Sequence, residues 1–284
     1  MSGSPVAIPG FDDAAFVAGT LAEDLGERGD ITSAAVIPAD ARFTGFMTAR
    51  ERIVVAGASL AAAFFTRLDP KASLDMMVGD GDVVEPGAAL MRIEGQARAL
   101  LTAERSALNT LQHLSGIATL TRTYVDAIAE TGAVLLDTRK TTPGLRLLEK
   151  YATRMGGARN HRMGLWDAAM IKDNHVAVAG GVRPAVQRAV AAGIDRIIVE
   201  VDRLDQITPA LDAGATWLLL DNMEADLLRQ AVALVGGRVP TEASGGVSLQ
   251  TICGIAEAGV TYISVGRLTQ SAPAVDIGLD FVGI

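Results

Sequence analysis

The stretch that decides the fold runs from residue 196 to residue 246 and reads RIIVEVDRLDQITPALDAGATWLLLDNMEADLLRQAVALVGGRVPTEASGG. It contains three short apolar runs, Arg196 to Val201, Thr216 to Leu220 and Val239 to Ala243, which have the length and composition of strands. The segments between them have the apolar spacing of amphipathic helices, centred near residues 208 and 229. Because a parallel strand is reached by a crossover, this alternation predicts a parallel sheet.

The same alternation continues on both sides of this stretch. Further strands are expected at Val134 to Asp137, Ala168 to Lys172 and Tyr262 to Val265, with helices near residues 150, 187 and 254. A long helical stretch from Gln96 to Glu130 leads into the pattern. The second part of the chain is therefore predicted to hold six parallel strands.

Polar residues stand at the end of each predicted strand. In a closed or partly open barrel all six ends meet at one mouth, whereas in an open sheet only the ends near a switch point would meet. A barrel smaller than the eight-stranded kind is therefore favoured. The strand ends are Asp137-Thr138-Arg139-Lys140, Lys172-Asp173-Asn174-His175, Glu200-Val201-Asp202, Asp221-Asn222, Glu242-Ala243-Ser244-Gly245-Gly246 and Gly266-Arg267.

The first part of the chain has a different pattern, typical of a separate α plus β domain. A helix is expected at 11–28, a strand at 43–49, a helix at 56–67 and two short strands within 73–93. The turn-rich piece at 79–87 is similar to the hairpins of biotinyl and lipoyl carrier domains. It has no lysine at its tip to be modified, which argues against a carrier.

The charge of the chain is unevenly distributed. The formal net charge is -8, which argues against a general affinity for nucleic acid or for an acidic membrane. Residues 139–175 nevertheless hold eight Lys and Arg against three Asp and Glu, so an anionic ligand would be bound there. Within this segment Arg146, Lys150 and Arg154 are spaced by four residues, and we expect them to form a solvated helical face.

Several features predict a cytoplasmic protein. The single cysteine, Cys253, rules out an intramolecular disulfide and is expected to be buried and inert. Residues 1–16 hold no Lys or Arg, unlike the start of a secretory signal. The longest apolar stretch, 53–65, has 13 residues and is too short to span a bilayer.

A series of motifs in register along nearly the whole chain resembles the quinolinate phosphoribosyltransferases. The central ones are DTRKTTPGLR at 137–146, NHRMGL at 160–165 and IKDNH at 171–175. The others are EDLG at 23–26, GDIT at 29–32, ERSALN at 104–109, HLSGIAT at 113–119, EVD at 200–202, LDNM at 220–223, EASGG at 242–246 and SVG at 264–266. The chain departs from the family pattern at two positions. Gln270 stands where the family often has His, and Ala158 stands where the family often has a third Gly.

The resemblance implies a fold and an assembly. An α/β sandwich domain would comprise residues 1–112, joined by about 271–284, and an open α/β barrel of fewer than eight strands would comprise residues 113–270. It also implies a homodimer in which the mouth of each barrel is closed by the partner's sandwich domain, so that Arg105 acts across the interface. The implied reaction transfers phosphoribosyl from phosphoribosyl pyrophosphate to quinolinate with decarboxylation.

The acceptor carries two adjacent ring carboxylates, so its site needs at least two forked donors. Arg105, Arg139 and Arg162 can supply these donors, with His161 and Lys172 nearby, and Thr138 and Lys140 are also expected to bind substrate. Lys140 and Lys172 are also predicted to be catalytic cations that bridge the two substrates, since lysine is a compact point charge suited to phosphate.

The donor brings several further negative charges and needs a divalent metal. Glu200 and Asp221, at successive strand ends, are expected to bind Mg²⁺ or the ribose hydroxyls and to stabilise a developing sugar cation. Backbone N–H groups at Ser244, Gly245, Gly246 and Gly266 are expected to hold the 5′-phosphate.

Two alternatives remain open from the sequence. A paralogue associated with molybdenum transport shares the Thr-Arg-Lys and His-Arg-x-Gly-Leu segments, but differs where this chain has residues 172–175, which favours quinolinate. A non-enzymatic binding or regulatory module would not need polar groups at all six strand ends.

Overall fold

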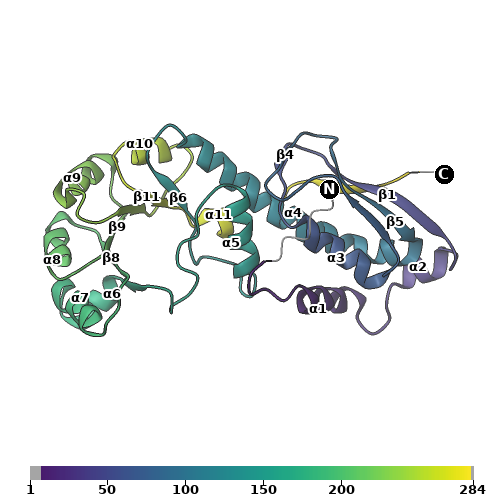
Figure 1. Cartoon of the computed structure of the whole chain (residues 1–284), viewed down its shortest axis with the longest axis horizontal. Coiled ribbons are helices and arrows are strands. Elements are labelled where there is room, and N and C mark those ends of the chain that lie inside the picture. Colours follow the sequence, from purple (N-terminus) through teal and green to yellow (C-terminus); the bar gives the residue numbers. More distant parts are fainter. Residues whose placement is uncertain (1–7, 283–284) are drawn as a thin grey trace. The chain divides into compact units, whose positions relative to one another are not determined.

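The computed structural model describes residues 8–282, which form two compact units (Figure 1). The first unit takes in the described residues up to Arg122, then Thr142–Gly157, and finally the described residues from Ser271 onward. The second unit consists of Thr123–Thr141 and Ala158–Gln270. Residues 113–122 and 142–157, which the sequence-based boundaries assigned to the barrel, thus group with the first unit.

The first unit is built on an antiparallel four-stranded sheet. Its strand order is β12 (Ile277–Phe281), β1 (Arg42–Ala49), β5 (Ala89–Gln96) and β3 (Ser73–Met76). Alternate residues of β1 are buried, as expected for a strand with one face on the core. A further pair, β2 (Ile53–Val54) and β4 (Val83–Val84), means that residues 73–93 contribute to three strands where two were predicted.

Among the described residues, five helices belong wholly or mainly to the first unit. Phe64 and Phe65 of the third helix and Leu100 and Leu111 of the fourth are fully buried, in one apolar cluster with Met47 of β1. The helices are α1 (Asp13–Leu25), α2 (Ile31–Val36), α3 (Ala58–Leu68), α4 (Ala97–Ala127) and α5 (Arg146–Met155). At 31 residues α4 is long enough to cross a bilayer. No helix within residues 8–282 is both long and apolar enough to do so.

Helix α5 corrects one expectation. Lys150, predicted to lie on a solvated face with Arg146 and Arg154, has a relative exposure of 0%. The neighbouring Glu149 is equally buried, where one carboxylate oxygen lies 3.0 Å from Nε2 of His113 and the other accepts from the Thr142 backbone N–H. A spacing of four identifies one face of a helix, but it does not show whether tertiary packing covers that face.

The second unit is an open α/β barrel. Its six strands are all parallel, in the order β6 (Val134–Leu136), β11 (Tyr262–Ser264), β10 (Thr241–Ser244), β9 (Trp217–Asp221), β8 (Ile197–Val201) and β7 (Ala169–Ile171). No pairing between β6 and β7 closes the sheet among the described residues. The predicted six-stranded, partly open barrel is therefore confirmed, with every strand within two residues of its expected bounds.

Helices lie outside these strands, and in Figure 1 α7 to α10 form an arc around them. Their bounds are α6 (Asp173–Ala179), α7 (Val182–Ala191), α8 (Ile207–Asp212), α9 (Ala225–Val235), α10 (Ile252–Ala256) and α11 (Arg267–Gln270). Cys253 in α10 is exposed, so the expectation of a buried thiol was wrong. Ile252 and Ala256 lie on the buried face of α10. Cys253 is one residue further along the helix than Ile252, so its side chain points away from that face.

Candidate active site

A cavity of about 910 Å³ opens at the carboxyl ends of the barrel strands. Twelve of the thirteen residues predicted to bind substrate line it, and all twelve belong to the second unit. They are Thr138, Arg139, Lys140, His161, Arg162, Lys172, Glu200, Asp221, Ser244, Gly245, Gly246 and Gly266. The barrel thus collects side chains from the ends of all six strands, as its parallel topology requires.

The thirteenth residue, Arg105, does not line this cavity. It lies exposed on α4 in the first unit, next to Glu104, whose pKa is raised by burial against the opposing effect of the Arg105 charge. The cavity also has lining residues that were not predicted to bind substrate. They include Met170, Asn222, Glu242, Val247, Ser248, Ser264, Val265, Arg267 and Gln270.

One side of the cavity is cationic. Arg162 is 8% exposed, and its Nη1 donates to the backbone carbonyl of Ala168 at 2.9 Å. Burial lowers the pKa of Arg162, and the nearby charge of Arg139 lowers it further, while Asp167 opposes both. The buried Nε of Arg139 has no hydrogen-bond partner within residues 8–282. An unpaired buried donor is unfavourable, so this side of the cavity suits an anionic ligand that would accept from it.

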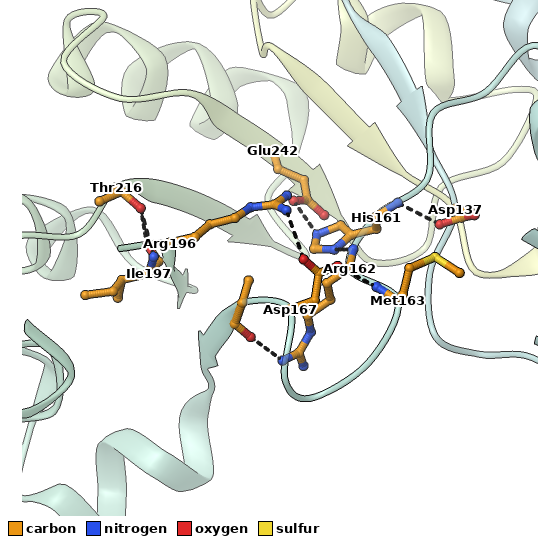
Figure 2. A network of polar contacts seen from close by, with 10 residues as sticks. Asp137, His161, Arg162, Met163, Asp167, Arg196, Ile197, Thr216 and Glu242 are labelled. Carbon is orange, nitrogen blue, oxygen red and sulfur yellow. Dashed lines mark hydrogen bonds and ion pairs between the residues drawn. The ribbon is translucent and has the colours of Figure 1, made fainter. Parts of the chain in front are cut away.

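Two buried carboxylates hold the segment that carries Arg162 (Figure 2). Asp137, directly after β6, accepts from the backbone N–H of His161 at 2.8 Å and from the Asn160 side chain. Glu242 of β10 lies on the other side, with its Oε2 3.0 Å from Nε2 of His161. Glu242 belongs to the EASGG motif, but within that motif only Ser244, Gly245 and Gly246 were predicted to bind substrate.

The cavity lining also includes carboxylates at neighbouring strand ends. Glu200 on β8 and Asp221 on the neighbouring β9 both line the cavity, and Asp221 accepts from the Asn222 side chain at 2.6 Å. Lys172 forms an ion pair with Glu200. Two carboxylates on adjacent strands can bind ribose hydroxyls or a hydrated cation.

Glu200 and Asp221 fit Mg²⁺ only if the metal has further ligands. Within residues 8–282 no cluster of three or more His, Cys, Asp and Glu side chains could hold a metal ion. Mg²⁺, however, usually keeps several waters and is bound by one or two carboxylates together with substrate phosphates. Glu200 and Asp221 therefore fit a metal that binds with the phosphorylated substrate.

A tight turn follows β10 at the cavity. Gly245 has φ +91°, and a Cβ there would lie 2.1 Å from the Oδ1 atom of Asn222, so the position requires glycine. Asn222 itself has φ 53°, the one positive value at a non-glycine residue among those described, and its N–H donates to the Ser244 carbonyl at 2.8 Å. The two backbones approach closely, which leaves N–H groups accessible to a phosphate.

Comparisons with known proteins agree with this architecture. Residues 30–115 match the family model described as quinolinate phosphoribosyl transferase, N-terminal domain, and residues 117–280 match the C-terminal domain of the same family. A quinolinate phosphoribosyltransferase [decarboxylating] of Nicotiana tabacum is 41% identical over 97% of this chain and 84% of that protein. A probable nicotinate-nucleotide pyrophosphorylase [carboxylating] of Bacillus subtilis is 40% identical over 91% and 89%.

Solved structures give the same result. The nicotinate-nucleotide pyrophosphorylase from Francisella tularensis superposes with a TM-score of 0.92 at 37% identity, covering 98% of this chain and 100% of that one. The enzyme of the same name from Ehrlichia chaffeensis has a TM-score of 0.91 at 36% identity, covering 96% and 100%. The similarity thus extends over both units.

Proposed function

The chain belongs to the quinolinate phosphoribosyltransferase family, and we propose that the cavity of its barrel unit is where the family reaction takes place. The enzyme transfers phosphoribosyl from phosphoribosyl pyrophosphate to quinolinate, giving nicotinate mononucleotide, pyrophosphate and CO₂ in NAD biosynthesis. One observation carries the assignment of the site. A single cavity brings together five Lys and Arg side chains, the carboxylates of Glu200 and Asp221 and a glycine turn, which are the groups that two polyanionic substrates need.

The cationic side of the cavity is the proposed acceptor site. Arg139 and Arg162 supply forked donors for the two ring carboxylates, and the unpaired Nε of Arg139 gains an acceptor when the ligand binds. Each charged hydrogen bond of this kind contributes about 1.5 to 3 kcal/mol. Arg105 is the proposed third donor, supplied by the partner subunit of a homodimer.

The rest of the cavity is the proposed donor site. The N–H groups of the turn 244–246 and of Gly266 would bind the 5′-phosphate. Lys140 and Lys172 would contact both substrates, while Glu200 and Asp221 would hold the ribose hydroxyls and Mg²⁺. When bound there, the metal would neutralise charge on the leaving pyrophosphate.

The chemistry then follows from positioning and charge. The ring nitrogen attacks the anomeric carbon while the bond from that carbon to the pyrophosphate oxygen breaks, and its electron pair leaves with pyrophosphate. Glu200 and Asp221 stabilise the positive charge that develops on the sugar. The ribosylated nitrogen is cationic, so it stabilises the carbanion left when the adjacent carboxylate departs as CO₂, and the carbanion takes up a proton.

The direct test supplies quinolinate, phosphoribosyl pyrophosphate and Mg²⁺ and follows the release of CO₂ and pyrophosphate. A parallel reaction replaces quinolinate by nicotinate, which has one carboxylate. We expect nicotinate to release far less pyrophosphate, because it leaves buried cationic donors without an acceptor. Equal turnover of the two acceptors would contradict the proposed acceptor site.

The homodimer and a cytoplasmic location stay predictions. Sedimentation velocity on the purified protein tests the first, with a species of twice the chain mass expected. Fractionation of cells that produce the protein tests the second.

A further inference from the structure

One carboxylate of the cavity lining, that of Glu242, has no role in the proposed reaction. Glu242 of β10 is 0% exposed, and its Oε2 lies 3.0 Å from Nε2 of His161. Its second oxygen, Oε1, is buried without a hydrogen-bond partner among the described residues. Burying a carboxylate in a barrel is unfavourable unless its charge is compensated. The presence of Glu242 next to the proposed acceptor site therefore needs a physical reason.

The contacts of His161 determine which of its nitrogens carries the proton (Figure 2). Its Nδ1 lies 2.7 Å from the backbone nitrogen of Arg162, which donates to it. Two donors cannot face each other, so Nδ1 is unprotonated. A neutral imidazole has one N–H, which must then be at Nε2 and donates to Glu242. The His161 ring is therefore in the Nε2–H form.

His161 consequently connects Glu242 to Arg162. Its ring donates to the carboxylate at one end and accepts from the Arg162 backbone at the other. The side chain of Arg162 is fixed independently, because its Nη1 donates to the Ala168 carbonyl at 2.9 Å. The guanidinium of Arg162 is thus held through both its backbone and its side chain.

We infer that Glu242 is a positioning residue for the acceptor site, which keeps His161 in the neutral Nε2–H form and thereby holds Arg162 ready for a carboxylate of the acceptor. The inference rests on the proposed function for the identity of that acceptor. An aromatic contact already locates the His161 ring, since its centroid lies 6.0 Å from that of Trp217. Glu242 adds an acceptor for Nε2–H, which supports the tautomer that the Arg162 N–H also favours and orients the ring.

The first test is ¹⁵N NMR of the histidine rings in the wild-type protein near neutral pH. The chain has three histidines, so His161→Asn assigns the relevant signals by difference. The expected spectrum of His161 is that of the Nε2–H tautomer. An Nδ1–H tautomer or an imidazolium would overturn the inference, whether or not the protein is active.

The second test separates the two substrates. Glu242→Ala should raise the KM for quinolinate about 10-fold or more and allow a mixture of His161 tautomers, because without the acceptor for Nε2–H the ring can turn away from the Arg162 N–H. The KM for phosphoribosyl pyrophosphate should change by less than about twofold. Glu242→Gln retains an amide oxygen that can accept from Nε2–H, so it should restore most of the quinolinate affinity. Glu200→Gln is the matched control, with the larger effect expected on phosphoribosyl pyrophosphate.

A double-mutant cycle shows whether Glu242 acts on quinolinate binding through His161. If Glu242 acts through His161, Glu242→Gln and Glu242→Ala should add little to the quinolinate KM of His161→Asn. Fully additive effects, or a raised KM with an unchanged tautomer, would overturn the inference. Should Glu242→Ala fail to fold, the tautomer of His161 in the wild-type protein still decides. A folded wild-type protein with the Nε2–H tautomer and no transferase activity would instead count against the proposed function.

Discussion

Lys172 and Glu200 form an ion pair across the ends of two neighbouring strands, β7 and β8. The Lys172 side chain is 45% exposed and that of Glu200 is 14% exposed, so the carboxylate is the more enclosed partner. A partly exposed lysine held by an enclosed carboxylate has a defined position at the cavity yet remains accessible to a phosphate or carboxylate oxygen.

Lys172→Arg should therefore reduce activity although it keeps the charge. The guanidinium is larger, planar and forked, and it cannot replace a compact ammonium at the same point. We expect a loss of about 2 to 4 kcal/mol of transition-state stabilisation, measured as kcat/KM.

Lys71→Arg is the matched control, because Lys71 is exposed in the first unit and lines no part of the cavity. It should leave kcat/KM unchanged. Lys140→Arg should behave like Lys172→Arg. If both cavity lysines tolerated arginine with near-full kcat/KM, only the general basic character of the segment would matter.

Gly266→Ala should disturb Lys140 without unfolding the barrel. A Cβ at residue 266 would lie 2.7 Å from Cδ of Lys140, so that side chain must move. We expect kcat/KM to fall about 10-fold while the free energy of unfolding changes by less than about 0.5 kcal/mol. Steady-state kinetics and urea unfolding measure the two effects.

Gly254→Ala serves as its control, since a Cβ there has no neighbour within 4 Å and residue 254 lies in α10. It should leave activity intact and stabilise the helix by up to about 1 kcal/mol. Full activity in Gly266→Ala would mean that the position of Lys140 at Gly266 is unimportant for the reaction.

Arg105→Ala should abolish quinolinate binding and leave the proposed dimer intact, because the proposed partner of this exposed α4 residue is the ligand in the neighbouring subunit. Mixing this variant with Lys172→Ala tests whether Arg105 acts across subunits. Each mixed dimer would have one mouth with a wild-type Lys172 and the partner's wild-type Arg105, so some activity should return. No recovery after proven subunit exchange would place Arg105 in its own subunit's site.

Asp30 should make the stability of the first unit depend on pH. Its carboxylate accepts from the Ser33 N–H, which caps α2, and from the Thr102 hydroxyl, each at 2.9 Å. These hydrogen bonds, Ser33 first, lower the pKa of Asp30. A carboxyl with a lower pKa in the folded state stabilises that state above its unfolded pKa of about 3.9, and the contribution disappears as pH falls through the folded value.

Asp30→Asn retains a capping oxygen and removes the titration. The unfolding free energy of the wild type should therefore fall more steeply than that of the variant as the pH is lowered below about 4. Urea unfolding at neutral and acidic pH measures the difference. Parallel pH curves would show that this carboxylate contributes no proton-linked stability.

The barrel strands were predictable because their sequence signal is local. A short apolar run such as Ile197–Val201 lies between polar turns, and parallel pairing brings the strand ends together whatever their separation in sequence. The residues that line the cavity followed from the same rule. Helix α2 was not predicted, because a six-residue segment is too short to show helical periodicity.

Other features depend on contacts that no local pattern contains. His161 and Glu242 are 81 residues apart, and nothing in either segment specifies that their side chains meet. The burial of Lys150 likewise depends on what packs over α5. The positive φ of Asn222 is required by its approach to Gly245, which only the paired strands β9 and β10 bring about.

The pairing of β12 with β1 has a consequence for how the protein is made. Residues 277–281 complete the sheet that begins at residue 42, with Phe281 opposite Gly45. On the ribosome, where synthesis runs from the amino terminus, the edge of β1 stays unpaired until residues 277–281 have been translated, after all six barrel strands. An unpaired strand edge is prone to associate with other chains. Nascent chains truncated before residue 277 should therefore bind chaperones or aggregate even though all six barrel strands have been synthesised.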